Sequence, residues 1–484
     1  MTDDRLPIKI DSTSNGEYRP LPVPKLLRKA HDLANRRLTE NARRTGISRR
    51  AFVNGLCGAA TTLAAFNTVF AARGNLGGRF ALPAEAALDM AAAEDSLAGD
   101  EFIFDVQTHL IEPKGGWRQS NPGFERILRW WPQGDCGESD PVDCYSAAHY
   151  LKEVFHDSDT TMAVLSFIPA PADRNPLSMA EAARTRDLVA ALGNGRRLLL
   201  HAMVLPNLPP LESQLKRMEQ AIENWDIAAW KVYTQWGPRG IGWALDDEDV
   251  GIPFIEKARA LGVHNICIHK GLTFPRLSPK FTDCADVGRV ARRFPDMNFI
   301  VYHSGLETDT REGAYDPDNA ARGVNTLIKS LADNGIAPNS NVYAELGSTW
   351  RILMRDPTAA AHTLGKLMKY VGRERLLWGT DSIWYGSPQD QIQAFRAFEI
   401  SEQLREQHGY PALDAAQKAK VFGLNGAAVY GIESGAVRRK AGLDPAGRLK
   451  AAYLENPEPS HLTYGPRTDY EFDLLQDARN GWPD

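Results

Sequence analysis

The chain has 484 residues, of which 43% are hydrophobic and 24% are charged, an ordinary composition for a globular protein. This length allows one large domain with extensions. The formal net charge of −5 gives no indication of a nucleic-acid partner, and the absence of a C-x-x-C pair among the five cysteines argues against a thiolate zinc site.

Residues 1–95 are typical of an export signal followed by a linker. Ser48-Arg-Arg-Ala-Phe-Val53 resembles the twin-arginine export motif, and an apolar stretch of small residues follows it over 55–72. A basic segment followed by an apolar one is the pattern of a signal peptide. It predicts export to the periplasm or another extracytoplasmic space, with cleavage between Ala71 and Ala87. The alternative is a cytoplasmic protein with an ordinary surface helix that carries two arginines.

From Glu101 onward, apolar runs alternate with helical patterns. Continuous apolar runs are typical of buried parallel strands, and Asp356-Pro357 and Gly372 mark the start and end of one intervening helix. Eight such units predict an α/β fold, a (β/α)8 TIM barrel over residues 101–432. The rival, a doubly wound open sheet, usually has a Gly-rich phosphate loop after its first strand, and none is present. The predicted strands are 102–109, 161–169, 198–207, 227–236, 265–271, 298–305, 341–347 and 376–382.

Two segments interrupt or follow this regular spacing. About 50 residues separate the first two strands, far more than a usual connection, so we expect them to form a wall or lid of the site. Cys136 and Cys144 flank an acidic loop in this segment, and a disulfide between them is plausible in an exported protein. Residues 433–484 are polar and contain several prolines, which predicts an irregular C-terminal extension.

Four predicted strands end in residues that can bind a metal ion. Gln107 and His109 are two positions apart, so their side chains point to the same side of the first strand. His269, His303 and Asp381 end the fifth, sixth and eighth strands. Barrel enzymes carry their chemistry at the C-terminal ends of the strands, and this pattern therefore predicts a metal site there.

The sequence resembles the amidohydrolase superfamily, in particular the amidohydrolase-related branch that includes aminocarboxymuconate-semialdehyde decarboxylase. The resemblance is carried by Asp105-Val-Gln-Thr-His109, Ile268-His-Lys-Gly271, Tyr302-His-Ser-Gly305, Trp378-Gly-Thr-Asp-Ser382 and Gly423-Leu-Asn-Gly-Ala-Ala428. It implies one divalent metal ion, zinc first, with manganese or iron as alternatives. By this resemblance Gln107, His109, His269 and Asp381 would be the ligands, His303 would polarise the substrate or transfer a proton, and Asp381 would also be the base.

Gln107 is a departure, because the first strand of that family normally carries His-x-His. An amide oxygen is a weaker ligand than imidazole, although relatives that are decarboxylases use Glu-x-His at this place. Lys231 on the fourth strand could be a carboxylated bridging lysine, a cation for a substrate carboxylate, or part of a buried ion pair, and the last two are favoured. Glu345 would be the partner of Lys231 or His303, or a ligand that compensates for Gln107. His201 is expected to be a core histidine.

Three functions follow. The first is a metal-dependent hydrolase in which metal-activated water attacks a C–N or C–O carbonyl. The second is a non-oxidative decarboxylase of an aromatic or unsaturated acid, and the third is a non-catalytic binding barrel. The substrate is expected to be a small molecule, aromatic or anionic, in a chain that could form a homo-oligomer. The aromatic and cationic residues expected near the mouth are Trp117, Trp236, Arg239, Arg276, Trp350, Arg351, Trp384 and Tyr385.

Overall fold

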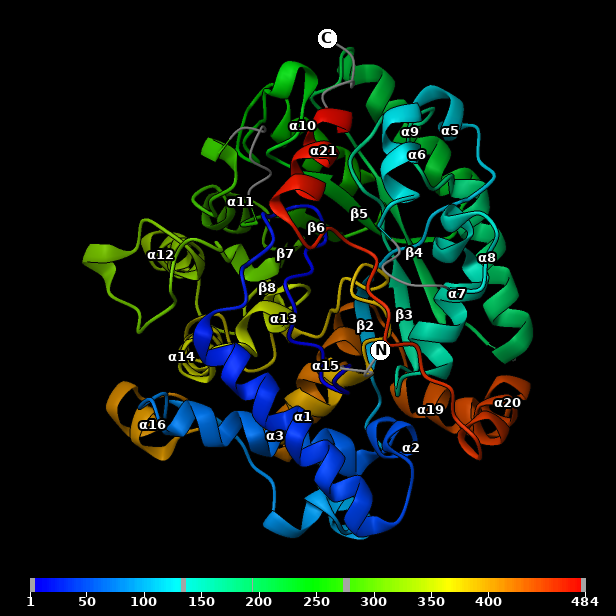
Figure 1. Ribbon diagram of the computed structural model, residues 1–484. Helices are drawn as coiled ribbons and strands as arrows, with labels where there is room; N and C mark the ends of the chain where they lie inside the picture. The colour runs from blue at the N-terminus through cyan, green and yellow to red at the C-terminus, as the bar shows by residue number, and fades with distance from the viewer. Residues whose placement is uncertain (1–4, 132–135, 194, 273–278, 480–484) are drawn as a thin grey trace.

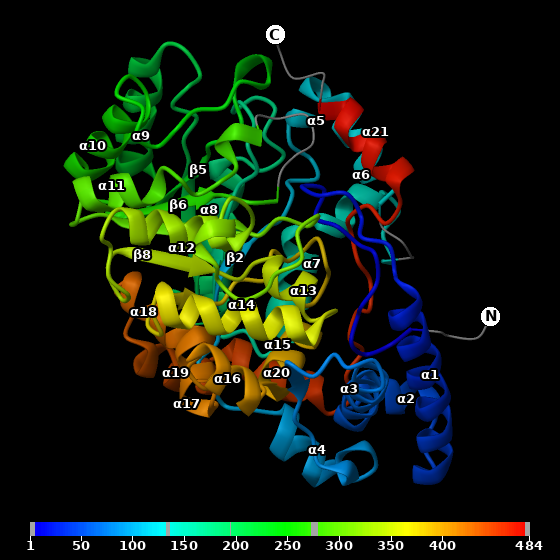
Figure 2. The ribbon, with the colours of Figure 1, turned by 90° about the vertical axis from the view of Figure 1, so that its left-hand side faces the viewer.

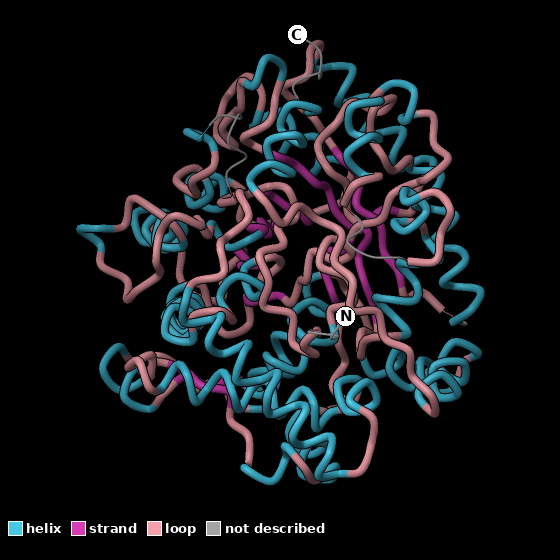
Figure 3. The backbone as a smooth tube through the Cα atoms, viewed as in Figure 1, coloured by secondary structure: helices cyan, strands magenta, loops and turns pink. Residues whose placement is uncertain are grey.

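Eight parallel strands form a closed barrel at the centre of the molecule, as the sequence predicts (Figure 3). The computed structural model describes residues 5–131, 136–193, 195–272 and 279–479. The strands pair in chain order, and Thr108 bridges to Ser382 to close the barrel. The strands are β2 (Phe104–Thr108), β3 (Met162–Leu165), β4 (Leu198–Met203), β5 (Ile227–Tyr233), β6 (Asn265–His269), β7 (Asn298–Tyr302), β8 (Val342–Glu345) and β9 (Leu376–Leu377).

Helices surround the strands and bury their outer faces (Figure 1). Helix α14 begins where the sequence indicates, because the Asp356 side chain accepts a hydrogen bond from the Ala359 amide and Pro357 lies in the first turn. The helices after each strand are α5 (Trp117–Ser120), α6 (Pro122–Leu128), α7 (Ala147–Leu151), α8 (Met179–Gly193), α9 (Leu211–Asn224), α10 (Gly251–Ala260), α11 (Val287–Arg293), α12 (Val324–Asp333), α13 (Thr349–Leu353), α14 (Pro357–Tyr370), α15 (Gln389–Ala397), α16 (Glu402–His408), α17 (Ala415–Ala419) and α18 (Asn425–Val429).

The barrel interior is filled with apolar and aromatic side chains at one end and polar ones at the other. Phe104, Val164, Ile300 and Leu377 are among the residues that pack together inside it, with less than 2% of each exposed. Tyr430 packs against this cluster from the segment after β9. A filled interior fixes the strand register, so the side chains at the strand ends are held in defined positions.

Residues 5–97 pack against the barrel. Helix α3, which contains the apolar stretch of the predicted signal, is buried between α1, α4 and α15, and the Leu63 and Phe66 side chains are fully buried. Figure 2 shows these helices gathered at one end of the molecule. The elements are α1 (Lys25–Thr45), α2 (Arg49–Asn54), α3 (Leu56–Ala71), β1 (Gly78–Phe80) and α4 (Met90–Leu97), and β1 pairs antiparallel with β10 (Phe398–Ile400). The export signal stays a prediction.

The prediction of an irregular C-terminal extension is wrong in one respect, because the described part of residues 433–484 contains three helices. They are α19 (Ser434–Leu443), α20 (Pro445–Leu454) and α21 (Asp469–Arg479). Pro445 begins α20 after an Asp444 cap, and proline is tolerated in the first turn of a helix, where its missing N–H has no partner to lose. Helix α21 packs on α6, beside the amino-terminal segment (Figure 1). No helix in the described ranges is long and apolar enough to cross a membrane.

Candidate metal centre

The structure brings the predicted strand-end residues to one end of the barrel. Gln107 is in β2, His109 follows it, His269 ends β6, His303 follows β7 and Asp381 follows β9. All five are at most 3% exposed. They fall into two neighbouring groups, one around Asp381 and one around the two histidines His269 and His303.

The Asp381 carboxylate receives hydrogen bonds on both oxygens. Oδ1 accepts from Gln107 Nε2 at 2.9 Å and lies 3.0 Å from His109 Nε2, and Oδ2 accepts from Ser348 Oγ and Asn15 Nδ2, each at 2.6 Å. Burial alone would raise the pKa of Asp381, but the hydrogen bond and charge of His109, with His303 and Ser348, hold it well below its usual value. Asp381 is therefore an anion at neutral pH.

His269 and His303 point their ring nitrogens at each other. His303 Nε2 lies 3.2 Å from His269 Nδ1. The other nitrogens face carbonyl oxygens: His303 Nδ1 is 2.7 Å from Gly347 O, and His269 Nε2 is 3.3 Å from Leu272 O. A carbonyl only accepts, so those nitrogens carry the protons, and the two facing nitrogens present lone pairs.

The third member of this group is Glu17, which comes from the amino-terminal segment. Its carboxylate oxygens lie 3.5 Å from His269 Nδ1 and 3.4 Å from His303 Nε2. Glu17, His269 and His303 each offer one ligand atom, and these three atoms all lie within 4.8 Å of one another. Among the described residues they are the group of three or more His, Cys, Asp or Glu side chains that meets this distance. Two neutral imidazoles and a carboxylate are a donor set that suits zinc, manganese or iron, so the residues fit the metal that the sequence predicts.

Burial reinforces the neutral state of the imidazoles. It lowers the pKa of His303 to about 4 and moves the pKa of His269 below its ordinary value. A neutral imidazole keeps the lone pair that a metal ion needs. The prediction that Gln107, His109, His269 and Asp381 are the ligands stays a prediction, and in the structure Gln107 and His109 both face Asp381.

Three residues of the site have left-handed backbone conformations, which are uncommon for side chains other than glycine. The φ angles are 62° at His303, 54° at Ser348 and 62° at Asp381. Such conformations cost of order 1–3 kcal/mol each and cluster at functional sites, where the surrounding structure holds them. Each of them directs a side chain away from its strand and into the centre.

Glu345 and Lys231 do not form the ion pair that the sequence suggested. Glu345 accepts hydrogen bonds from the backbone amides of His303 and Gly347, and burial raises its pKa to about 8, so it is largely neutral. Lys231 Nζ instead lies over the Tyr302 ring, 3.5 Å from its centroid, with no hydrogen-bond partner among the described residues. A side chain at position 347 would collide with Glu345 and with Gln107, which explains the glycine there.

His201 is a core histidine, as expected. It is fully buried, with Nδ1 3.1 Å from Ser166 Oγ and Nε2 3.1 Å from the Tyr430 hydroxyl. Both nitrogens are thus satisfied away from the metal centre.

The residues expected around the mouth divide into several groups. Trp384 lies beside His109, with 5.9 Å between ring centroids, whereas Trp350 is a core residue that donates to Gln391 O. Arg351 is buried and forms an ion pair with Asp11 at 2.7 Å, so its charge is already paired within the protein. Arg276 lies outside the described residues.

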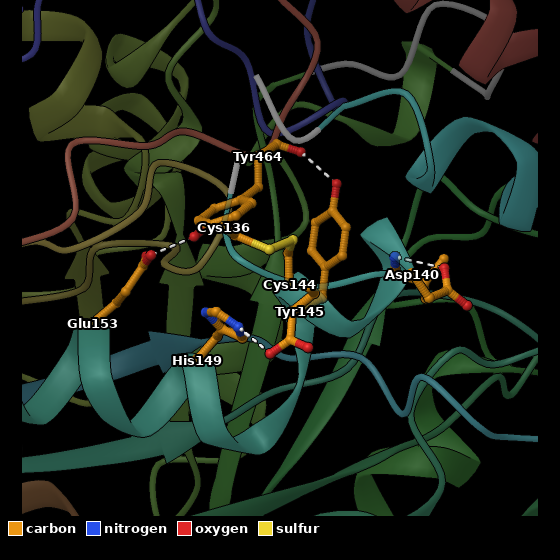
Figure 4. Close-up of a disulfide and its surroundings, with 9 residues drawn as sticks. Cys136, Asp140, Cys144, Tyr145, His149, Glu153 and Tyr464 are labelled. Carbon is orange, nitrogen blue, oxygen red and sulfur yellow. Dashed lines mark hydrogen bonds and ion pairs between the residues drawn. A yellow bond between two sulfur atoms is a disulfide. The ribbon is translucent and has the colours of Figure 1, made fainter. Parts of the chain in front are cut away.

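The long connection after β2 packs against the same end of the barrel, as predicted. Trp117, Trp131 and Tyr145 from this segment form one apolar cluster with Trp384 and Tyr464. The predicted disulfide between Cys136 and Cys144 is present, with the two Cα atoms 6.0 Å apart (Figure 4). Figure 4 also shows Tyr464 of the C-terminal segment reaching Glu153. The connection and the C-terminal segment together form a wall near His109.

Sequence reasoning missed Asn15, Glu17 and Ser348. Asn15 is 366 positions from Asp381 in the sequence, and no local pattern joins them. The only signal was Ser14-Asn-Gly-Glu17, a turn-forming run that stood in a segment assigned to an export signal.

The family model described as amidohydrolase matches residues 104–432. Among solved structures, 5-carboxyvanillate decarboxylase from Sphingomonas paucimobilis is 15% identical, with a TM-score of 0.42 over 68% of this chain and 99% of its own. A 2,6-dihydroxybenzoate decarboxylase is 14% identical (TM-score 0.39, 69% and 100%), and an amidohydrolase from Bifidobacterium longum subsp. infantis is 13% identical (TM-score 0.34, 69% and 100%). No curated protein matches the chain.

Proposed function

Because the chain belongs to the amidohydrolase family, whose members are metal-dependent enzymes, we propose that it is a metal-dependent hydrolase of C–N or C–O carbonyl compounds. The observation that carries this proposal is the position of Asp381, an anionic carboxylate held beside two neutral imidazoles. Zinc is the ion expected, with manganese or iron as alternatives.

Asp381 is the base in this proposal. Oδ1 is held by Gln107 and His109, and Oδ2 by Ser348 and Asn15. A carboxylate with this many donors is a weak base, so it takes a proton efficiently only from water that has been acidified. A divalent ion, when bound, supplies that acidity and polarises the carbonyl.

The other residues position the reacting groups. The Gly347 carbonyl fixes the His303 ring by accepting from Nδ1, so that Nε2 points into the centre. His109 Nε2 donates to Asp381 Oδ1 at 3.0 Å, which orients the carboxylate and keeps it anionic. Trp384 covers His109 and restricts the access of bulk water.

The alternative is non-oxidative decarboxylation, and one observation favours it. Lys231 is a fully buried amine whose charge lies over the Tyr302 and Tyr233 rings, with no counter-ion within ion-pairing distance among the described residues. Burial lowers its pKa to about 8, so it remains largely protonated at neutral pH. A substrate carboxylate would supply the missing anion.

The test is a substrate panel assayed with the purified, metal-supplemented chain. Amides, lactones and esters are followed by release of acid, and hydroxybenzoates by release of carbon dioxide, with Asp381→Asn and His269→Ala as controls. Acid release that both substitutions abolish supports the hydrolase, whereas carbon dioxide release supports the decarboxylase. If the chain binds a compound without turning it over, and His269→Ala does not change that binding, only the non-catalytic binding barrel remains.

Export by the twin-arginine route stays part of the proposal. The Cys136–Cys144 disulfide supports it, because disulfides persist in oxidising compartments outside the cytoplasm. Cell fractionation with an antibody against the chain tests it, and light scattering on the purified protein tests the expected homo-oligomer. Recovery of the chain only from the cytoplasm would contradict export.

A further inference from the structure

The amino-terminal arm, residues 5–20, runs across the end of the barrel that carries the metal centre. Figure 1 shows it in blue beside β6, β7 and β8, next to α21. Ile8, Ile10, Ser14 and Tyr18 in the arm are each at most 4% exposed. A segment this buried is part of the folded protein and not a loosely attached leader.

The arm is anchored to the barrel loops by buried polar contacts. Lys9 Nζ donates to the carbonyl oxygens of Tyr385 and Ser387, each at 2.8 Å, and the Lys9 amide donates to Asp390 at 2.9 Å. Further along, Asp11 pairs with Arg351. Charge-assisted hydrogen bonds in a buried setting are among the strong ones, so these contacts fix the path of the arm.

The C-terminal segment holds the arm from the other side. The Ser14 amide donates to Pro466 O at 2.9 Å, the Thr13 and Thr463 hydroxyls are 3.0 Å apart, and Arg19 pairs with Asp469 and Asp473 on α21. The arm therefore lies between the barrel and the C-terminal segment, and both would have to move before it could leave.

A tight turn in the arm directs two side chains into the metal centre. The Gly16 amide donates to Ser14 Oγ, and the Glu17 amide donates to Asn15 Oδ1 at 2.9 Å, with a φ of 84° at Gly16. Glycine adopts this conformation without steric cost. Asn15 Nδ2 donates to Asp381 Oδ2 and to Glu17 Oε2, at 2.6 and 2.5 Å, and so connects the two groups of the site.

The distances within Glu17, His269 and His303 match those of metal ligands. Ligand atoms about 2.0–2.1 Å from a tetrahedral ion are about 3.3–3.4 Å apart. His303 Nε2 lies 3.2 Å from His269 Nδ1 and 3.4 Å from one Glu17 oxygen, and the other Glu17 oxygen lies 3.5 Å from His269 Nδ1. With one oxygen taken from Glu17, the three ligand atoms all lie within 4.8 Å of one another. Two imidazole nitrogens and a carboxylate that converge on one point supply three protein ligands, which leaves a fourth position open, as in catalytic zinc sites.

We propose that Glu17 is a ligand of the metal ion, so that the amino-terminal arm is a permanent part of the metal centre. This inference shares with the proposed function only the need for a metal ion in this site.

The proposed role of Glu17 also has a consequence for export. Cleavage between Ala71 and Ala87 would sever Glu17 from the barrel, and the working enzyme is therefore the uncleaved chain.

Metal binding by the full-length chain tests this without a substrate. Cobalt is titrated against a competing chelator and followed by its visible ligand-field spectrum, and the metal content is counted by elemental analysis. Glu17→Gln keeps the size of the side chain but is expected to weaken cobalt binding at least 10-fold and to change the spectrum. Glu17→Asp, which keeps a carboxylate, should retain part of the affinity.

Asp32→Asn is the matched control, because Asp32 is an exposed carboxylate of the same amino-terminal region that lies on α1, outside the arm and the metal centre. It should bind cobalt within about 3-fold of the wild type, a difference below 1 kcal/mol. Wild-type affinity and spectrum in Glu17→Gln, with metal lost in His269→Ala, would overturn the inference and leave the proposed function intact. Absence of metal from the wild type would overturn both.

The native chain provides a second, independent result. Intact mass and amino-terminal sequencing of protein isolated from its own cells should find residues 5–20 in the metal-loaded form. A metal-loaded chain that begins after Ala71 and has no bound amino-terminal fragment would overturn the inference.

Discussion

Gln107 donates a hydrogen bond from Nε2 to Asp381 Oδ1 over 2.9 Å, on the oxygen that also faces His109 Nε2. The amide thus supports the anionic state of Asp381, whereas its own Oε1 has no hydrogen-bond partner among the described residues. An amide can donate in this way and a carboxylate cannot. The departure from His-x-His therefore has a structural role in the protein, whichever residues bind the metal.

Gln107→Glu should destabilise the metal-free protein at pH 8 by about 2 kcal/mol, because it replaces a buried donor by a second carboxylate. At pH 5 the two carboxyl groups can share a proton, and most of this loss should disappear. Urea unfolding at both pH values measures the effect, with Gln107→Met as the uncharged control. Equal destabilisation by Gln107→Glu at pH 5 and pH 8 would contradict this role for the amide.

Asp381→Asn should lower turnover of any substrate by about 10²–10⁴-fold, the range lost with a general base. Ser348→Ala removes the hydrogen bond to Asp381 Oδ2 and the contact with the Tyr385 hydroxyl. It should cost about 10-fold or less, equivalent to about 1.4 kcal/mol. Steady-state kinetics on both variants provides the comparison. If the serine variant were the more damaged of the two, Asp381 would not be the base.

Lys231→Met should leave the free energy of unfolding unchanged or raise it by about 1 kcal/mol, because it removes a buried amine that has no hydrogen-bond partner among the described residues. Its KM for carboxylate substrates should rise at least 10-fold if the amine binds the substrate anion.

Lys270→Met is the control for Lys231→Met. Lys270 is equally buried but pairs with Asp286 at 2.8 Å. Its loss leaves a buried carboxylate unpaired and should cost about 3–5 kcal/mol. Denaturant unfolding should show a large loss in the free energy of unfolding for Lys270→Met and no loss, or a small gain, for Lys231→Met. Similar large losses in both variants would mean that Lys231 has a structural partner.

Glu153 should make stability depend on pH. Burial raises its pKa from 4.5 to about 7 in the folded chain. Between these values the folded state holds a proton that the unfolded state has lost, so stability falls as the pH rises through this window, by up to about 3 kcal/mol. Glu153→Gln lacks this titrating group. The free energy of unfolding of this variant, relative to that of the wild type, should therefore be higher at pH 8 than at pH 5. Parallel pH profiles for the two proteins would rule this out.

The barrel and its strand-end residues could be predicted because their signals are local. Each strand is one short apolar run, and the topology of a (β/α)8 barrel brings His269, His303 and Asp381 to one end without further information. The Cys136–Cys144 disulfide was also predictable, because the two cysteines are only 8 positions apart.

The contribution of the amino-terminal arm could not be predicted, because it depends on contacts between distant parts of the chain. Asn15 and Glu17 precede the basic and apolar segments that resemble an export signal, and no metal-ligand pattern surrounds them in the sequence. The helices of the C-terminal extension could not be predicted for a different reason. Its polar, proline-containing sequence is typical of irregular structure, whereas Pro445 lies in the first turn of α20, where proline is tolerated.

The role proposed for Glu17 depends on a metal ion that lies between the amino-terminal arm and the barrel. Anomalous diffraction from crystals of the full-length chain grown with zinc or cobalt tests it most directly. We expect one peak per chain, about 2.0–2.2 Å from a Glu17 oxygen, His269 Nδ1 and His303 Nε2. A peak bound by Gln107 and His109 with no contact to Glu17, or no peak at this end of the barrel, would contradict it.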